Sequence, residues 1–149
     1  MTAVPREIEI VRVFDAPREL VWNAWTVPEQ LASWWGKRGW STPVSSITMD
    51  VRPGGAFRLT SISSDDGAEM RLEATYREID PPERLVFESG DGRRATVTLV
   101  EREAGGTEMT FRTTMEASKE LLRRATAGML SAFDRLGEQL QTTTTRSRA

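Results

Sequence analysis

Turn-forming residues recur at nearly even intervals through the middle of the chain, and this spacing limits the possible folds more than any other feature. Glycine- or proline-containing turns lie at residues 53–55, 66–67, 80–82, 90–92 and 105–106. Because such turns are short, the segments that they join must run antiparallel if they form strands. We therefore expect six strands in series between Val44 and Thr114, which is an antiparallel meander.

The strand pattern is clearest in the segment EMRLEATYREID, from Glu69 to Asp80. Met70, Leu72, Ala74 and Tyr76 alternate with charged or polar residues. Strict alternation is typical of a strand with one covered face and one face in water. The same alternation returns in the last two expected strands, so the sheet is predicted to need a cover on one side.

The expected cover is one long helix from about Ala117 to Gln141. Its apolar residues recur at steps of three and four and form a single stripe: Leu122, Ala125, Met129, Ala132, Phe133, Leu136 and Leu140. Such a stripe must pack on another apolar surface, and the covered face of the sheet is the one available. Residues 142–149 are polar and lack this periodicity, so they are predicted to be a disordered tail.

A further strand is expected at the start of the chain, from Glu7 to Phe14. Its β-branched residues favour a strand. The alternation slips at Ile10 and Val11, which indicates either a bulge or a strand buried on both faces.

Two short helices are expected between this strand and the meander. Asp15 offers an N-cap for the first helix, which runs through Trp25. Thr26 and Glu29 have the spacing of a capping box, which predicts the start of the second helix. The second helix carries the adjacent residues Trp34 and Trp35, which cannot point the same way because neighbours on a helix are about 100° apart. We expect one of the two in the core and the other at its border.

The residues after this helix, from Gly36 to Trp40, form a glycine-bounded basic loop. The loop is predicted to be flexible and to act as a lid, with Trp40 at its end able to cover a ligand or a partner protein. We expect Trp22 and Trp25, on the first helix, to anchor that helix to the sheet.

Composition excludes several classes of function. A chain of 149 residues fits a single domain, with an ordered core expected at about residues 6–141. The 20 basic and 22 acidic side chains are scattered, so nucleic acid is not an expected partner. The chain has no cysteine and no histidine, which removes thiolate and imidazole chemistry, and we assign no catalytic residue, cofactor or metal ion. The sequence shows neither a leader pattern nor a membrane span, so a cytoplasmic location without membrane insertion is expected.

Four segments, in this order and spacing, resemble a known family. They are DAPRELVWNAWTVPEQLASWWG (Asp15 to Gly36), VRPGGAFRL (Val51 to Leu59), YREIDPPERLVF (Tyr76 to Phe87) and GGTEMTF (Gly105 to Phe111). With the elements between them, the chain resembles the helix-grip superfamily of START and birch-pollen-allergen-like domains. Within it, the chain is similar to the branch named for the C-terminal domain of the activator of Hsp90 ATPase.

The resemblance implies an α+β helix-grip fold over residues 1–149. In this fold a curved antiparallel sheet of about seven strands, in the order β-α-α-β6-α, wraps around the long C-terminal helix. It also implies an apolar cavity between sheet and helix that takes a hydrophobic or amphipathic small molecule. The expected ligand-binding residues are Trp34, Trp35, Trp40, Phe57, Met70, Leu72, Tyr76, Val97, Leu99, Met109, Phe111, Met129 and Phe133.

Tyr76 is the most specific of these, because it is the only tyrosine and a buried phenol normally finds a hydrogen-bond partner. A protein that binds such a small molecule could be a carrier, a sensor or a stress-related binding protein. Two alternative functions remain open. One is a protein-interaction module resembling the Hsp90 activator, although the chain holds only the one domain. The other is an enzyme that cyclises or dehydrates a polyketide-like substrate, and a homodimer is compatible with each of these functions.

Overall fold

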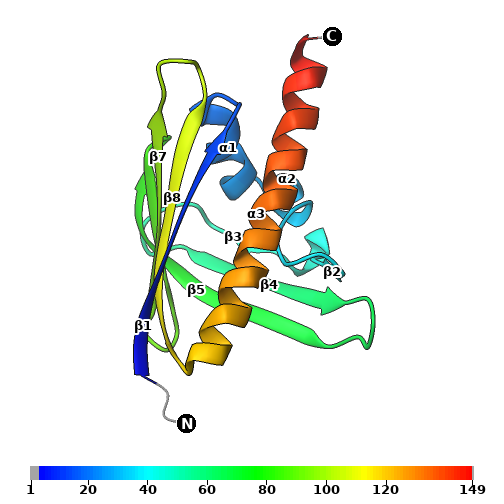
Figure 1. Ribbon diagram of the computed structural model, residues 1–149, viewed down its shortest axis with the longest axis vertical. Helices are drawn as coiled ribbons and strands as arrows, with labels where there is room; N and C mark the ends of the chain where they lie inside the picture. The colour runs from blue at the N-terminus through cyan, green and yellow to red at the C-terminus, as the bar shows by residue number, and fades with distance from the viewer. Residues whose placement is uncertain (1–3, 149) are drawn as a thin grey trace.

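The computed structural model describes the backbone of residues 4–148 and the side chains of residues 4–142. The chain forms a curved antiparallel sheet of eight strands with the long helix α3 lying across one of its faces (Figure 1). The strands are β1 (Val4–Phe14), β2 (Trp40–Ser41), β3 (Thr48–Met49), β4 (Ala56–Ser63), β5 (Glu69–Asp80), β6 (Arg84–Ser89), β7 (Arg94–Glu101) and β8 (Thr107–Ala117). The helices are α1 (Arg18–Thr26), α2 (Pro28–Ala32), the short 3₁₀ helix η1 (Val44–Ser46) and α3 (Lys119–Arg148). The α+β helix-grip fold expected from the sequence is confirmed.

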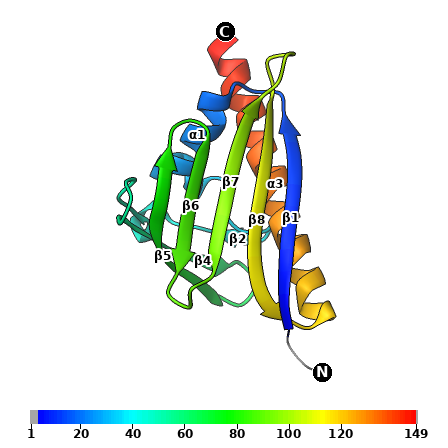
Figure 2. The same ribbon diagram turned by 90° about the vertical axis from the view of Figure 1, so that its left-hand side faces the viewer.

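The sheet order follows from the meander. The strands lie in the order β1-β8-β7-β6-β5-β4-β2, and β3 also pairs with β4. Seen from its outer side, the sheet covers α3, which runs behind the strands (Figure 2). Six strands, β3 to β8, occupy the region where six were predicted, and β2 adds one more in the segment that the sequence assigned to the loop.

The edge strand β1 is regular, which corrects the expected bulge. It pairs with β8 in unbroken register from Val4 opposite Ala117 to Phe14 opposite Thr107. Ile10 faces α3 and is buried, whereas Val11 is 50% exposed on the outer face. The break in alternation is therefore an apolar residue in water, as is Val13 on the same face, which is 55% exposed. Exposed apolar side chains are common on protein surfaces.

A bulge does occur, in β5 rather than in β1. Tyr76 pairs with Phe87 and Glu78 pairs with Val86, so Arg77 is the extra residue on β5. Beyond this point the odd-numbered Ile79 packs against the core, whereas before it the even-numbered residues do. The strict alternation of Glu69–Asp80 therefore ends at Tyr76.

The helix ends differ from those expected. Helix α1 has Pro17 as its N-cap with no side-chain hydrogen bond, so Asp15 does not cap it. The Thr26 hydroxyl donates to the Trp22 carbonyl, 2.8 Å away, and Val27 is the N-cap of α2. Because α2 follows α1 after one residue, Thr26 still belongs to the last turn of α1 and bonds back along it.

Helix α3 extends further than its apolar stripe. The sequence predicted an end near Gln141 and a disordered tail over residues 142–149, but the helix continues through Arg148. Leu136 and Leu140 are buried and hold the preceding turns in place. Once a helix is established, each added residue gains one hydrogen bond, so polar residues can extend it.

Candidate functional site

Aromatic side chains pack between the sheet and α3 around Phe133, at the middle of the helix, and we call them the aromatic cluster. Its members come from nearly every element around that space: Trp25, Trp34, Trp35, Phe57, Tyr76, Phe87, Phe111 and Phe133. The ring centroids of neighbouring members lie between 4.7 Å, for Trp25 and Trp34, and 6.3 Å, for Trp25 and Phe111. Rings at these distances gain more stability than their buried area alone provides.

The expected ligand-binding residues fall into three groups by exposure. Buried are Trp34, Phe57, Tyr76, Val97, Leu99, Met109, Phe111 and Phe133. Half-buried are Trp35, Trp40, Leu72 and Met129. Met70 alone is exposed, at 64%. The structure therefore brings most of the set together between the sheet and α3, and whether they bind a ligand stays a prediction.

Met70 corrects the expectation that every apolar residue of this strand lies on the covered part of the sheet. It pairs with Ser61 near the tip of the β4–β5 hairpin. Figure 1 shows this hairpin extending past α3. The side chain keeps the alternation of the strand but is mostly exposed, so Met70 does not belong to the enclosed set.

The two adjacent tryptophans divide as predicted. Trp34 is 1% exposed, and its indole N–H donates to the Ala24 carbonyl at 2.9 Å. Trp35 is half-buried and sets its ring edge-on to Phe57, with 5.8 Å between the centroids. Trp34 is therefore a core residue, and Trp35 is the member of the cluster at its border.

Helix α3 closes more tightly on the sheet from Ala132 onward than before it. From Ala132 onward it contributes Ala132, Phe133, Leu136 and Leu140, all buried. Before Ala132 it contributes Leu122, Ala125 and Met129, which pack against the core but are only half-buried. Leu72 and Trp35 are likewise half-buried against the core, so we call Trp35, Leu72, Leu122, Ala125 and Met129 the apolar rim.

Arg135 of α3 holds the loop that the sequence predicted to be flexible. Its guanidinium donates to four backbone carbonyls: Gly36 at 2.8 Å, Ser33 and Trp40 at 3.2 Å, and Trp35 at 3.3 Å. Burial, with a smaller effect from the nearby Arg38 charge, lowers the pKa of Arg135 from its ordinary value. An arginine on a helix face normally predicts only a solvated charge, so the sequence offered no signal for this role.

Two more contacts join the same loop to α3. The Arg38 backbone N–H donates to the Ser131 hydroxyl at 3.0 Å, and the Arg38 guanidinium forms an ion pair with Glu138. Gly36 and Gly39 both have φ of +90°, a conformation that favours glycine. The loop is therefore a fixed turn on α3 in this structure, and β2 begins directly after it at Trp40, with the Lys37 ammonium 5.8 Å from the Trp40 ring centroid.

Two hydrogen-bond donors inside the aromatic cluster have no acceptor among the described residues. They are the Tyr76 hydroxyl and the Trp25 indole N–H. Tyr76 is 1% exposed, and its ring stacks on Phe57 with 5.2 Å between centroids and 5° between planes. A buried donor without a partner costs about 1–3 kcal/mol. The sequence predicted a hydrogen-bond partner for this phenol from the protein or from a ligand, and the described residues of the protein do not supply one.

The hydroxyl of Tyr76 stays protonated at neutral pH. Burial raises the pKa of Tyr76 above its ordinary value, with no contribution from a neighbouring charge. Two arginines of β1 are engaged elsewhere, because Arg12 pairs with Asp134 at 2.7 Å and Arg6 donates to the Ala117 carbonyl at 3.0 Å. The two unpartnered donors of the aromatic cluster are therefore both neutral at this pH.

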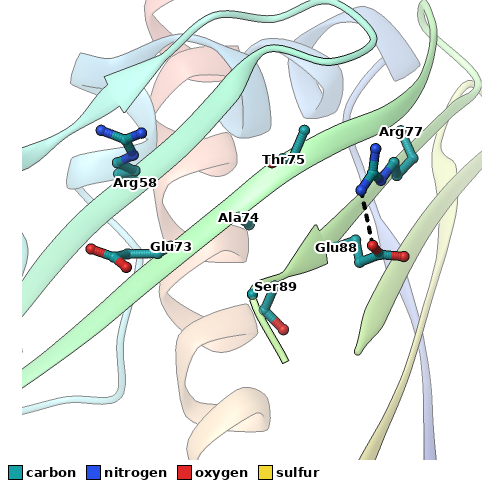
Figure 3. A pocket seen from close by; sticks show the side chains of 8 residues that line it. Arg58, Glu73, Ala74, Thr75, Arg77, Glu88 and Ser89 are labelled. Atoms are coloured by element: carbon teal, nitrogen blue, oxygen red, sulfur yellow. Dashed lines mark hydrogen bonds and ion pairs between the residues drawn. The ribbon is translucent and has the colours of Figure 1, made fainter. Parts of the chain in front are cut away.

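A polar hollow of about 500 Å³ lies on the outer face of the sheet, where the sequence predicted no site (Figure 3). Arg58 and Glu73 lie on one side of it, and Arg77 reaches toward Glu88 on the other, at 3.0 Å. Hydrogen bonds from Arg94 and Arg77 lower the pKa of Glu88. With both charge signs present and little apolar surface, this hollow does not suit an apolar ligand.

The described residues do not gather three or more carboxylates where they could hold a metal ion. Within the same part of the chain, no helix is both long and apolar enough to cross a membrane.

Comparison with known proteins agrees with this architecture. The family model described as "Activator of Hsp90 ATPase homolog 1-like protein" matches residues 15–141. A protein of Arthrobacter aurescens, solved by NMR, is 27% identical with a TM-score of 0.76, and the alignment covers 91% of this chain and 86% of that one. An AHSA1-like protein from Aeromonas hydrophila is 24% identical with a TM-score of 0.79, covering 93% and 94%. A Chromobacterium violaceum protein at 22% identity has a TM-score of 0.81 and covers 91% and 97%. No protein with a curated description matches this chain.

Proposed function

The chain belongs to the family of activator of Hsp90 ATPase homolog 1-like proteins, and on that premise we propose that it binds a hydrophobic or amphipathic small molecule between the sheet and α3. The fold is one whose members commonly hold hydrophobic ligands, but fold alone does not determine function. The support must therefore come from the residues of this chain.

The observation that carries the proposal is the change in burial along α3. From Ala132 onward the helix buries Ala132, Phe133, Leu136 and Leu140, whereas Leu122, Ala125 and Met129 before this point remain half-buried. The apolar residues Trp35 and Leu72 are also half-buried against the core. An apolar molecule seated on the apolar rim would remove this surface from water, which is worth about 25 cal/mol per Å².

The fixed loop gives this site one firm border. Arg135 holds the carbonyls of Trp35, Gly36 and Trp40, so the half-buried Trp35 ring is set in place before any ligand arrives. A binding surface that is already ordered loses less conformational entropy when it binds. The aromatic cluster behind Trp35 supplies the floor.

The test uses 1-aminoanthracene, an uncharged dye whose fluorescence rises in apolar surroundings. We expect saturable binding to the intact chain at one dye per protein. Met129→Gln places a polar group of similar size on the apolar rim and should weaken binding at least about fivefold.

Leu130→Gln is the matched control, because Leu130 is the next residue of the helix and is 39% exposed. It should leave the dye affinity unchanged. Thermal unfolding of both variants shows whether the fold is retained. Absence of saturable binding, or equal weakening by the two substitutions, would contradict the proposal.

A further inference from the structure

The two unpartnered donors in the aromatic cluster indicate what kind of ligand would fit. Several other buried polar groups of the described residues are satisfied by the protein: the Trp34 indole N–H donates to the Ala24 carbonyl, and the Thr107 hydroxyl donates to the Ala16 carbonyl at 2.7 Å. Tyr76 Oη and Trp25 Nε1 are exceptions. An exception to the general satisfaction of buried polar groups requires an explanation.

Both groups can donate a hydrogen bond, and the indole N–H of Trp25 can only donate. Both also connect to the border of the cluster through Trp35. The Trp35 ring lies 6.0 Å from the Trp25 ring and 5.8 Å from the Phe57 ring, and Phe57 stacks on Tyr76. A chain of ring contacts therefore links the two unpartnered donors to the border of the cluster at Trp35.

The charge of such a molecule is limited by the same surroundings. No neighbouring charge acts on the Tyr76 hydroxyl, and Arg12 is held by Asp134. The Arg135 guanidinium is taken up by backbone carbonyls. Neither of these two cations is free to pair with a buried anion, and burying an unpaired charge is far more costly than burying a neutral oxygen.

We infer that the ligand is an uncharged apolar molecule carrying a carbonyl or other neutral acceptor oxygen, and that Tyr76 Oη donates a hydrogen bond to that oxygen. This inference rests on the proposed function, and it adds the chemical class of the ligand and the residue that selects it. Tyr76 is thus a specificity-determining residue, because an isosteric ligand without the oxygen leaves its hydroxyl unpaired.

The experiment compares 2-acetylnaphthalene with 2-ethylnaphthalene, which differ by one carbonyl oxygen, as competitors of bound 1-aminoanthracene. The wild-type chain should bind the ketone about five- to tenfold more tightly than the hydrocarbon. Tyr76→Phe should abolish this preference by weakening the ketone alone, and it should unfold at a temperature no lower than that of the wild type. Trp25→Phe should keep the preference.

Equal affinities in the wild type, as expected if ordered water fills this position, would overturn the inference and leave the proposed function standing. Loss of the preference in Trp25→Phe instead of Tyr76→Phe would overturn the assignment to Tyr76. Failure of both naphthalenes to displace the dye would overturn the inference and, where the dye also fails to bind, the proposed function.

A second measurement does not depend on the variants. The infrared carbonyl band of 2-acetylnaphthalene bound to the wild-type chain should lie below its frequency in hexane, because a donated hydrogen bond weakens the C=O bond. A band at the hexane frequency would overturn the inference even if the Tyr76→Phe variant failed to fold.

Discussion

Replacing Arg135 with methionine should loosen the loop at residues 36–40 without disturbing the rest of α3. Methionine keeps an apolar stem of similar length and removes all the donors. The guanidinium makes its shortest contact, 2.8 Å, with the Gly36 carbonyl, and its other three lie at 3.2–3.3 Å. A hydrogen bond from a charged group contributes about 1.5–3 kcal/mol.

The three longer contacts add little to this value. Nη1 carries two hydrogens but serves the carbonyls of Trp35, Gly36 and Trp40, so these bonds share donors. Arg135 is only half-buried, and water can reach part of the loop once the side chain is gone. We therefore expect Arg135→Met to lower the free energy of unfolding by about 2 kcal/mol, or about 4–8 °C in Tm for a domain of this size.

Limited trypsin digestion reports on the loop itself, because Lys37 and Arg38 are the cleavage sites within it. Cleavage there should accelerate in Arg135→Met, since proteolysis follows the population of the locally open form. Arg123→Met, an exposed position on the same helix, is the control and should change neither stability nor cleavage. Unchanged Tm and unchanged cleavage in Arg135→Met would refute the idea that this residue holds the loop.

Three further outcomes follow from the packing and the charges. Tyr76 is the only tyrosine and burial raises its pKa, so the folded chain should show no phenolate absorbance near pH 10. Because the phenol ionises more readily in the unfolded chain, the free energy of unfolding should be unaffected by this group below about pH 10 and should fall as the pH rises further. The carboxyl of Glu88 should titrate below the ordinary glutamate range by NMR, with its stabilising effect lost as the pH falls through that lowered pKa, and Arg94→Gln should raise the pKa. In denaturant unfolding, Ile10→Ala should lower the free energy of unfolding by about 2–4 kcal/mol, and Val11→Ala should lower it by less than about 1 kcal/mol. Similar losses for the two variants would contradict the assignment of Ile10 to the buried face of β1 and Val11 to its exposed face.

The fold could be predicted because its signals are local. Evenly spaced turns, the alternation of Glu69–Asp80 and the stripe of α3 each lie within a short segment, and only one packing of helix on sheet satisfies them. The two-residue strand β2 escaped prediction because Trp40 and Ser41 become a strand only through pairing with Ser63 and Ile62 of β4.

The exposure and contacts of individual side chains could not be predicted, because they depend on where the helices and strands end in space. Met70 obeys the alternation of its strand, but its exposure follows from the length of the β4–β5 hairpin relative to α3. Arg135 holds a loop about a hundred residues away in sequence, a contact that no local pattern encodes. The sequence marked Tyr76 as a buried phenol in need of a partner, and the structure adds that the described residues do not provide one.

The location of the ligand is the central claim, and methionine methyl NMR tests it most directly. Met129 lies on the apolar rim, whereas Met70 is exposed on the hairpin. In a chain with ¹³C-labelled methionine methyl groups and saturating 1-aminoanthracene, we predict intermolecular NOEs from the dye to the Met129 methyl group and none to that of Met70. NOEs to Met70 without any to Met129 would contradict binding between the sheet and α3.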